Sequence, residues 1–172
     1  MRTTTFSKKC FFSALLELSK EQPYDEIQIK DICKKAGYNK STFYRIYTSK
    51  EDLLIDGFSS ISANEYFDTA RPGFGEIYID NVRLIFSYIR KNKEIFLMMH
   101  NARLDYKLYE MMRSVFPLPT EYKKGRKYYL AYQTSGYLSV IIEWLLGGMK
   151  ESDEYMANLI AEIIENSPIY KK

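Results

Sequence analysis

The sequence contains little of the chemistry on which most enzymes and metalloproteins depend. Its 172 residues include one histidine, His100, and two cysteines, Cys10 and Cys33. It has no G-x-S-x-G nucleophile motif, no glycine-rich phosphate loop, and no Cys or His residues at metal-ligand spacing. These absences argue against a hydrolase, a nucleotide-binding enzyme and a zinc protein. We therefore expect no catalytic residues, no metal and no cofactor, and we expect both cysteines to be reduced core side chains.

The sequence also lacks an apolar run long enough to cross a membrane. A spanning helix needs about 20 mostly apolar residues, and the longest candidate, Tyr137–Met149, is interrupted by Glu143. Near the N-terminus, Lys8 and Lys9 are followed by an apolar run too short for a signal peptide. We therefore expect a cytoplasmic protein that has no contact with a membrane.

Net charge is small, because 25 basic and 22 acidic residues leave only +3. The charge is unevenly distributed, however. Residues 1–50 carry ten Lys or Arg and five acids, a net +5, whereas the rest of the chain has a net −2. A basic N-terminal segment on a faintly acidic body fits a protein that binds DNA at one end. Taken alone, this charge distribution is better explained by lysines that only solvate helix surfaces than by DNA binding. The prediction of DNA binding therefore depends on the sequence motifs.

Residues 27–54, IQIKDICKKAGYNKSTFYRIYTSKEDLL, predict two short helices around a tight turn. The first, at about residues 28–36, has apolar side chains at i, i+3, i+4 and i+7, which form one helical face. Gly37 can adopt the left-handed backbone that ends a helix. Asn39 is a good N-cap for a second helix, at about residues 40–47. Two helices around a short glycine-containing turn form a helix-turn-helix, whose second helix enters the DNA major groove.

The second helix exposes polar side chains of the kinds that bind DNA. Amines and guanidinium groups donate to guanine edges or phosphates, and hydroxyl groups meet bases or the backbone. The candidates are Lys40, Ser41, Thr42, Tyr44 and Arg45. A capping-box-like run, Ser49–Asp52, starts a third helix, and Lys50 at its positive end can meet a phosphate. On the surface of a metabolic enzyme the same side chains would be unremarkable.

The run AGYNKSTFYRIYTSKEDLL closely resembles the signature of the TetR family. It has an alanine–glycine turn, a cap, a Thr-Phe-Tyr recognition core and a Ser-Lys-Glu-Asp-Leu start to the next helix. The resemblance covers about residues 6–56 and implies an all-helical homodimer with an N-terminal DNA-binding domain. It also implies phosphate contacts from Tyr44 and Lys50, and a DNA-facing position for Lys30. Gln28 departs from the Thr cap that the family usually has.

We expect an all-α fold of about nine helices in two domains. Residues 1–50 would form the helix-turn-helix domain, and residues 51–172 a helical domain for effector binding and dimerisation, which begins with a linking helix at residues 51–70. Thr4 or Thr5 would cap the first helix. The helices are expected at about residues 5–21, 28–36, 40–47, 50–68, 76–91, 95–99, 103–116, 121–146 and from 153 onwards.

The C-terminal domain is rich in methionine and aromatic residues. This composition suits an adaptable apolar pocket for a small apolar or aromatic effector. The pocket residues that we expect are Phe86, Met99, His100, Met112, Tyr137 and Trp144. The same side chains fit an ordinary helical core equally well.

Small residues inside the eighth helix and an apolar stripe on the ninth indicate a dimer interface. Glycine inside a helix costs about 1 kcal/mol relative to alanine, so its presence indicates close packing. Two such helices suit a four-helix bundle across a two-fold axis. The interface residues that we expect are Ser135, Gly136, Ser139, Ile142, Met156, Leu159, Ile160 and Ile163. A core within one chain is the alternative.

Together, these features predict a sequence-specific transcriptional regulator, a ligand-responsive repressor that acts as a homodimer on a pseudo-palindromic operator in double-stranded DNA. An alternative is a regulator or coactivator of the same fold that is controlled by a protein partner, because so short a chain leaves little room for an effector cavity. An enzyme is poorly supported.

Overall fold

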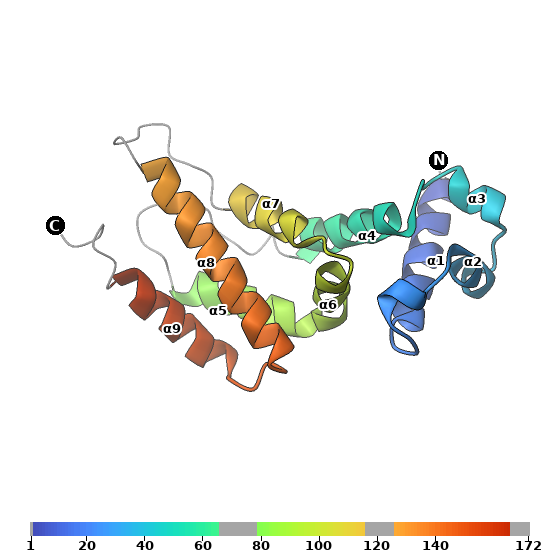
Figure 1. The fold of residues 1–172 in the computed structure, drawn as a ribbon. Coiled ribbons are helices and arrows are strands. Elements are labelled where there is room, and N and C mark those ends of the chain that lie inside the picture. The colour runs from blue at the N-terminus through green and yellow to red at the C-terminus, as the bar shows by residue number, and fades with distance from the viewer. Residues whose placement is uncertain (1, 66–78, 116–125, 166–172) are drawn as a thin grey trace. The chain divides into compact units, whose positions relative to one another are not determined.

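The computed structural model describes residues 2–65, 79–115 and 126–165. Within these ranges it contains nine α-helices, one 3-10 turn and no β-strand, so the predicted all-α class is confirmed (Figure 1). The elements are α1 (Arg2–Leu18), η1 (Tyr24–Glu26), α2 (Ile29–Ala36), α3 (Lys40–Tyr44), α4 (Lys50–Glu65), α5 (Ile79–Lys91), α6 (Lys93–Asn101), α7 (Asp105–Val115), α8 (Arg126–Leu146) and α9 (Asp153–Glu165).

The first helix differs from expectation at both ends. It begins at Arg2, so the prediction of a cap at Thr4 or Thr5 is wrong. Both threonines lie inside the helix, because nothing in its first turn breaks the helical backbone. The helix ends at Leu18 rather than near Glu21, because the N–H groups of Lys20 and Glu21 bond to carbonyls three residues back. Such short-range bonds tighten the chain into a turn.

Two later boundaries also have local causes. α3 ends at Tyr44, earlier than expected, because the N–H of Ile46 bonds to the carbonyl of Phe43, three residues back, at 2.8 Å. α7 begins after Arg103, whose φ of 57° is incompatible with a right-handed helix. The helix limits expected near residues 68, 76, 116 and 121 lie outside the described residues.

The chain divides into two compact units. The first comprises residues 1–65 and 94–104, and the second comprises residues 66–93 and 105–172. In the first unit α1 packs against α2 and α4, and the rings of Phe58 and Phe96 meet edge to face at 5.4 Å, which joins α6 to α4. The fully buried side chains of this unit include Phe11, Leu15, Ile27, Ile32, Phe43, Leu53, Leu54, Ile95 and Met99.

In the second unit α5 lies beside α9, and α7 packs against α8 (Figure 1). Phe86 on α5 and Trp144 on α8 meet edge to face, with ring centroids 5.1 Å apart. The other buried side chains of this core include Val82, Ile89, Leu108, Met112, Leu138, Ile141, Leu145, Met156 and Ile160. Apolar burial of this kind supplies most of the stability of an amphipathic helix pair.

Arg90 ties the turn between α8 and α9 to α5. Its guanidinium donates to the Asp153 carboxylate at 2.7 Å, and to the carbonyls of Met149 and Glu151 at 3.0 and 2.7 Å. It also lies over the Trp144 ring, 4.9 Å from the centroid. The planar fork of arginine suits several acceptors at once, so one side chain positions the whole turn.

None of the helices in the described ranges combines the length and the apolar character that crossing a bilayer requires. In the same part of the chain, no three His, Cys, Asp or Glu side chains gather as they would around a metal ion.

Candidate nucleic-acid interface

A glycine turn connects the two short helices of the first unit. Gly37 follows α2 with a left-handed backbone, φ 75°, and its N–H points back to the carbonyls of Cys33 and Lys34. The N–H of Tyr38 also bonds to the Cys33 carbonyl, at 3.0 Å. Residues with a Cβ rarely adopt this conformation, so the turn depends on glycine, as the sequence predicted.

Asn39 fixes the start of the second helix. Its side-chain oxygen accepts from the Thr42 N–H at 2.9 Å, and from the hydroxyls of Thr42 and Ser41, both at 2.8 Å. The predicted N-cap is therefore confirmed. Both hydroxyls donate toward the cap, which leaves their lone pairs to accept from a donor such as a base amine.

Phe43 anchors this helix in the core. Its side chain is fully buried, and its ring meets that of Phe11 on α1 edge to face at 5.3 Å. With Phe43 directed inward, Lys40, Ser41 and Arg45 are exposed, and Tyr44 is 55% exposed. The helix thus presents to solvent most of the side chains that the sequence predicted to meet DNA.

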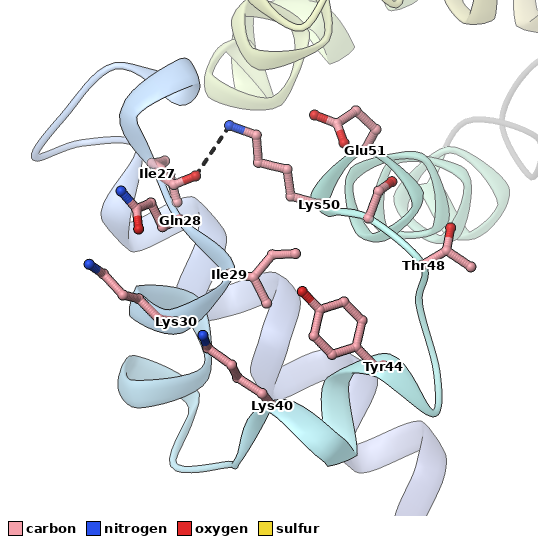
Figure 2. Close-up of a pocket in the computed structure, with 10 residues that line it drawn as sticks. Ile27, Gln28, Ile29, Lys30, Lys40, Tyr44, Thr48, Lys50 and Glu51 are labelled. Atoms are coloured by element: carbon pink, nitrogen blue, oxygen red, sulfur yellow. Dashed lines mark hydrogen bonds between the residues drawn. The ribbon is translucent and has the colours of Figure 1, made fainter.

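A groove of about 450 Å³ brings three segments of this unit together. Its lining comes from the entry to α2, from α3 and from the start of α4, and includes Lys30, Lys40, Tyr44 and Lys50 (Figure 2). Figure 2 shows the side chains of Lys30 and Lys40 on the same side of the groove. The amines of Lys30 and Lys40 and the phenol of Tyr44, around one opening, form a surface suited to an anion. Ser41, Thr42 and Arg45 lie outside this lining.

The start of α2, at the same groove, has no side-chain cap. Gln28 occupies the cap position with an extended backbone, and its side chain makes no capping bond. The first N–H groups of a helix need an outside acceptor, which this glutamine does not provide. Gln28, the residue that departs from the Thr cap usual in the family, therefore leaves this helix start without a side-chain cap.

Lys50 takes part in contacts that the sequence did not indicate. Its ammonium donates to the backbone carbonyls of Tyr24, Ile27 and Asp25 at 2.7, 3.2 and 3.3 Å. It also lies 4.3 Å from the centroid of the Tyr24 ring. Backbone carbonyls leave no mark in a sequence, so spacing alone had no means of indicating this arrangement.

Two buried tyrosines hold α4 to the rest of the unit. The Tyr24 hydroxyl donates to Glu51 at 3.1 Å, and the Tyr47 hydroxyl donates to Asp56 at 2.7 Å. Asp56 also pairs with Lys8 of α1 at 3.1 Å. Burial, followed by the carboxylate beside it, raises the pKa of each tyrosine well above its usual range. The sequence pattern predicted none of these contacts.

The start of α4 has the predicted cap in modified form. The Ser49 hydroxyl accepts from the Asp52 N–H at 3.1 Å. The Asp52 carboxylate reaches back to Thr48, accepting from its hydroxyl and, at 3.1 Å, from its N–H. The hydroxyl bond, followed by the N–H bond, lowers the pKa of Asp52. The reciprocal bond therefore starts one residue earlier than in a standard capping box.

The residues expected in an effector pocket lie in different units. Met99 and His100 are on α6 in the first unit, whereas Phe86, Met112, Tyr137 and Trp144 belong to the second. Trp144 is 4% exposed, contacts Phe86, and donates from Nε1 to the Glu151 carbonyl at 3.2 Å. Its indole is thus part of the packed core of the second unit.

The residues expected at a dimer interface also separate into two groups. Ser135, Gly136 and Ser139 are exposed on α8, and Ile163 on α9 is 49% exposed. Ile142 and Leu159 are half-buried. Met156 and Ile160, by contrast, are buried within the chain, 4% and 3% exposed, on the side of α9 that packs on α5.

Two family models match the sequence. The one described as bacterial regulatory proteins, tetR family, matches residues 11–56, and the one described as transcriptional regulator C-terminal region matches residues 78–166. The chain is also 37% identical, over 54 residues, to an uncharacterized HTH-type transcriptional regulator, YwcC, of Bacillus subtilis (strain 168). That alignment covers 31% of this chain and 23% of the relative.

Proposed function

The chain belongs to the TetR family of DNA-binding transcriptional regulators, and from this premise we propose that it is a homodimeric repressor. The dimer binds a pseudo-palindromic operator and leaves it when a small apolar or aromatic effector binds. DNA binding is assigned to residues 1–50. Effector binding and dimerisation are assigned to residues 51–172, and the linking helix expected at residues 51–70 is described by the structure as α4, to Glu65.

The observation that carries the proposal is the capped, core-anchored helix α3. Asn39 fixes where it begins and Phe43 fixes which side faces inward. Arg45 and Lys40 are exposed and can donate to guanine edges in the major groove. Lys30 and Tyr44, which line the groove beside Lys40, are suited to phosphates. The Ser41 and Thr42 hydroxyls complete the proposed reading surface.

Dimerisation through α8 and α9 would supply the second copy of this surface. The exposed small residues of α8, Ser135, Gly136 and Ser139, allow close approach of a partner helix. Ile163 and the half-buried Leu159 offer apolar contact from α9. We leave Met156 and Ile160 out of the proposed dimer interface, because the chain buries them in its own core. A two-fold axis would place two recognition helices about 34–36 Å apart, one helical turn of DNA.

The proposed effector acts by binding the two conformations of the dimer unequally. It would favour the conformation whose recognition helices no longer match successive grooves. By linkage, DNA weakens the effector as much as the effector weakens DNA. For the site we keep the second-unit residues Phe86, Met112, Tyr137 and Trp144, and we propose small apolar or aromatic ligands because these side chains are themselves apolar or aromatic.

The direct test is a gel shift with the DNA upstream of the protein's own gene. A shift that survives competition by random-sequence DNA and carries two protomers supports the proposal. A folded protein that fails to bind this DNA selectively, even at low salt, contradicts specific operator binding. If apolar compounds release the DNA and also raise the melting temperature of the protein, the result supports a small-molecule effector. If instead a protein co-purifies in stoichiometric amount and releases the DNA, the result contradicts control by a small molecule.

A further inference from the structure

We propose that Lys50 is a positioning residue, which holds the first turn of α4 against the segment that enters α2, rather than a phosphate ligand. This inference goes against the role that the family resemblance implies for the residue. Its consequence for DNA binding rests on the proposed function, whereas its consequence for the free protein does not.

The first step in the argument is that the ammonium group is already occupied. A lysine ammonium has three N–H donors, and Lys50 has three carbonyl partners, at 2.7, 3.2 and 3.3 Å. The ring of Tyr24, 4.3 Å from the ammonium, adds a cation–π contact. A phosphate oxygen could reach this group only by displacing at least one carbonyl.

The second step is that these carbonyls need the lysine. They belong to residues 24, 25 and 27, in and just after η1, where the chain makes a short turn before α2. The Tyr24 carbonyl already accepts from the Ile27 N–H at 3.1 Å, so the ammonium is a second donor to it, whereas a turn this short leaves its later carbonyls without helical N–H partners. Polar backbone groups that lose both their partner and water are costly, so the ammonium stabilises the turn as well as α4.

The third step is that the neighbouring residue contacts the same tyrosine. Lys50 bonds to the Tyr24 carbonyl, and Glu51 accepts from the Tyr24 hydroxyl at 3.1 Å. The first turn of α4 therefore holds both the backbone and the side chain of a tyrosine that is only 3% exposed. The segment so fixed leads directly into α2 and sets where Lys30 lies relative to Lys40 in the groove.

The test compares Lys50→Met with Lys40→Met in the full chain. Each substitution removes one ammonium from the same groove and keeps an unbranched side chain. Melting temperature is measured without DNA. Affinity for a random-sequence 30-bp duplex is then measured over a salt series, because phosphate contacts do not depend on sequence.

We expect Lys50→Met to lower the melting temperature by about 4 °C or more, as the removal of three hydrogen bonds from a chain of this size implies. Lys40→Met, at an exposed position, should leave the melting temperature unchanged. It should instead make the slope of log affinity against log salt shallower by about 0.9 for each phosphate that the protein no longer neutralises. An unchanged melting temperature in Lys50→Met, together with a shallower salt slope like that of Lys40→Met, would overturn the proposal.

Lys50→Arg keeps the inference testable if the methionine variant does not fold. The charge is retained, but a planar guanidinium does not converge on three carbonyls as an ammonium does. We expect faster hydrogen exchange of amides at residues 24–32 in the free protein. Wild-type exchange and wild-type affinity in Lys50→Arg would contradict a positioning role. If no variant or wild-type protein binds DNA, the melting and exchange results still decide on Lys50, and only the proposed function fails.

Discussion

The hydroxyl of Tyr47 donates a 2.7 Å hydrogen bond to Asp56 Oδ2, while Oδ1 of the same carboxylate pairs with Lys8 at 3.1 Å. One carboxylate thus joins α1, the segment after the recognition helix, and α4. Asp56 lies within α4, the helix expected to link the DNA-binding domain to the rest of the chain. A shift of this part of α4 would therefore act on Tyr47, three residues after the end of α3.

We expect Asp56→Ala to lower the free energy of unfolding by about 1–2 kcal/mol, chiefly through the unpaired, buried Tyr47 hydroxyl. The pair with Lys8 adds little, because both side chains are more than a third exposed. Glu110→Ala is a suitable control, since it removes an exposed surface pair with Lys107 and should change stability by less than about 0.5 kcal/mol. Chemical denaturation measures both variants, and equal effects would argue against the role of Asp56.

Alkaline pH should destabilise the protein through Tyr24 and Tyr47. Burial raises the pKa of both hydroxyls above the ordinary value of 10.0. Above that value the unfolded chain loses these protons while the folded chain keeps them, so the free energy of unfolding falls as pH rises. Below it, the two groups contribute no pH dependence.

The measurement is denaturation at a series of pH values from 8 to 11. Tyr24→Phe and Tyr47→Phe should each flatten the decline, since phenylalanine has no proton to lose. Tyr132→Phe, at a side chain that is 77% exposed, should retain the wild-type decline. If all three variants decline alike, ionisation of the two buried tyrosines is not the cause.

Replacement of the recognition-helix cap should weaken both folding and DNA binding. Asn39→Ala removes the acceptor for the Thr42 N–H and for two hydroxyls, at a cost of about 1 kcal/mol. A melting temperature lower by about 2–4 °C follows for a chain of this size. Asn158→Ala, at an exposed position inside α9, should leave stability unchanged or raise it, because alanine is the better helix former. A cap variant as stable as the wild type would contradict this prediction.

Two helical glycines should respond to alanine in opposite ways. A Cβ at Gly57 would overlap the ring of Phe12, so the ring or the helices α1 and α4 would have to shift, at a cost of about 1–3 kcal/mol. A Cβ at Gly136 would meet nothing within 4 Å, so Gly136→Ala should stabilise the monomer by up to about 1 kcal/mol. If α8 lies at the dimer interface, that variant should also raise the dimer dissociation constant. Sedimentation at several concentrations measures this constant, and unchanged dimerisation would place Gly136 outside the interface.

Arg45 and Tyr44 should contribute differently to DNA binding. Arg45→Ala should reduce discrimination at one base-pair position of the operator by about 1–3 kcal/mol, because base-edge contacts carry sequence information. Tyr44→Phe should weaken binding to all sequences to a similar extent, because a phosphate contact does not distinguish bases. Competition among single-site operator variants separates the two effects. Unaltered base preference in Arg45→Ala would show that this guanidinium does not read bases.

The turn and caps around the recognition helix were predictable because their causes are local. Gly37 and Asn39 act on backbone groups within three or four residues, so the residue type and its spacing are sufficient. Ser49 acts over the same range. The contacts of Lys50 and Asp56 were not predictable, because their partners lie 9 to 48 residues away in the chain. Residues so far apart in the chain come into contact only after the helices have packed.

The apolar face of α9 shows a different limit of prediction from sequence. The apolar stripe containing Met156 and Ile160 was interpreted correctly as a buried face, but periodicity does not say which chain buries it. The packing of α5 on α9 answers that question for these two residues. Ile163 lies on the same helical face, seven residues after Met156, but it is 49% exposed, so it is the kind of residue that a partner would cover. An apolar helical face is ambiguous until its neighbours are known.

The cap at Asn39 also has an electrostatic consequence. Aspartate would accept the same N–H and hydroxyl donors, and it caps helices about as well as asparagine. It would, however, bring a full negative charge to the surface that approaches DNA phosphates, and its capping strength would vary with its protonation. The neutral amide avoids that repulsion and does not titrate. The cap of the recognition helix therefore keeps the same charge over the whole pH range in which the protein is folded.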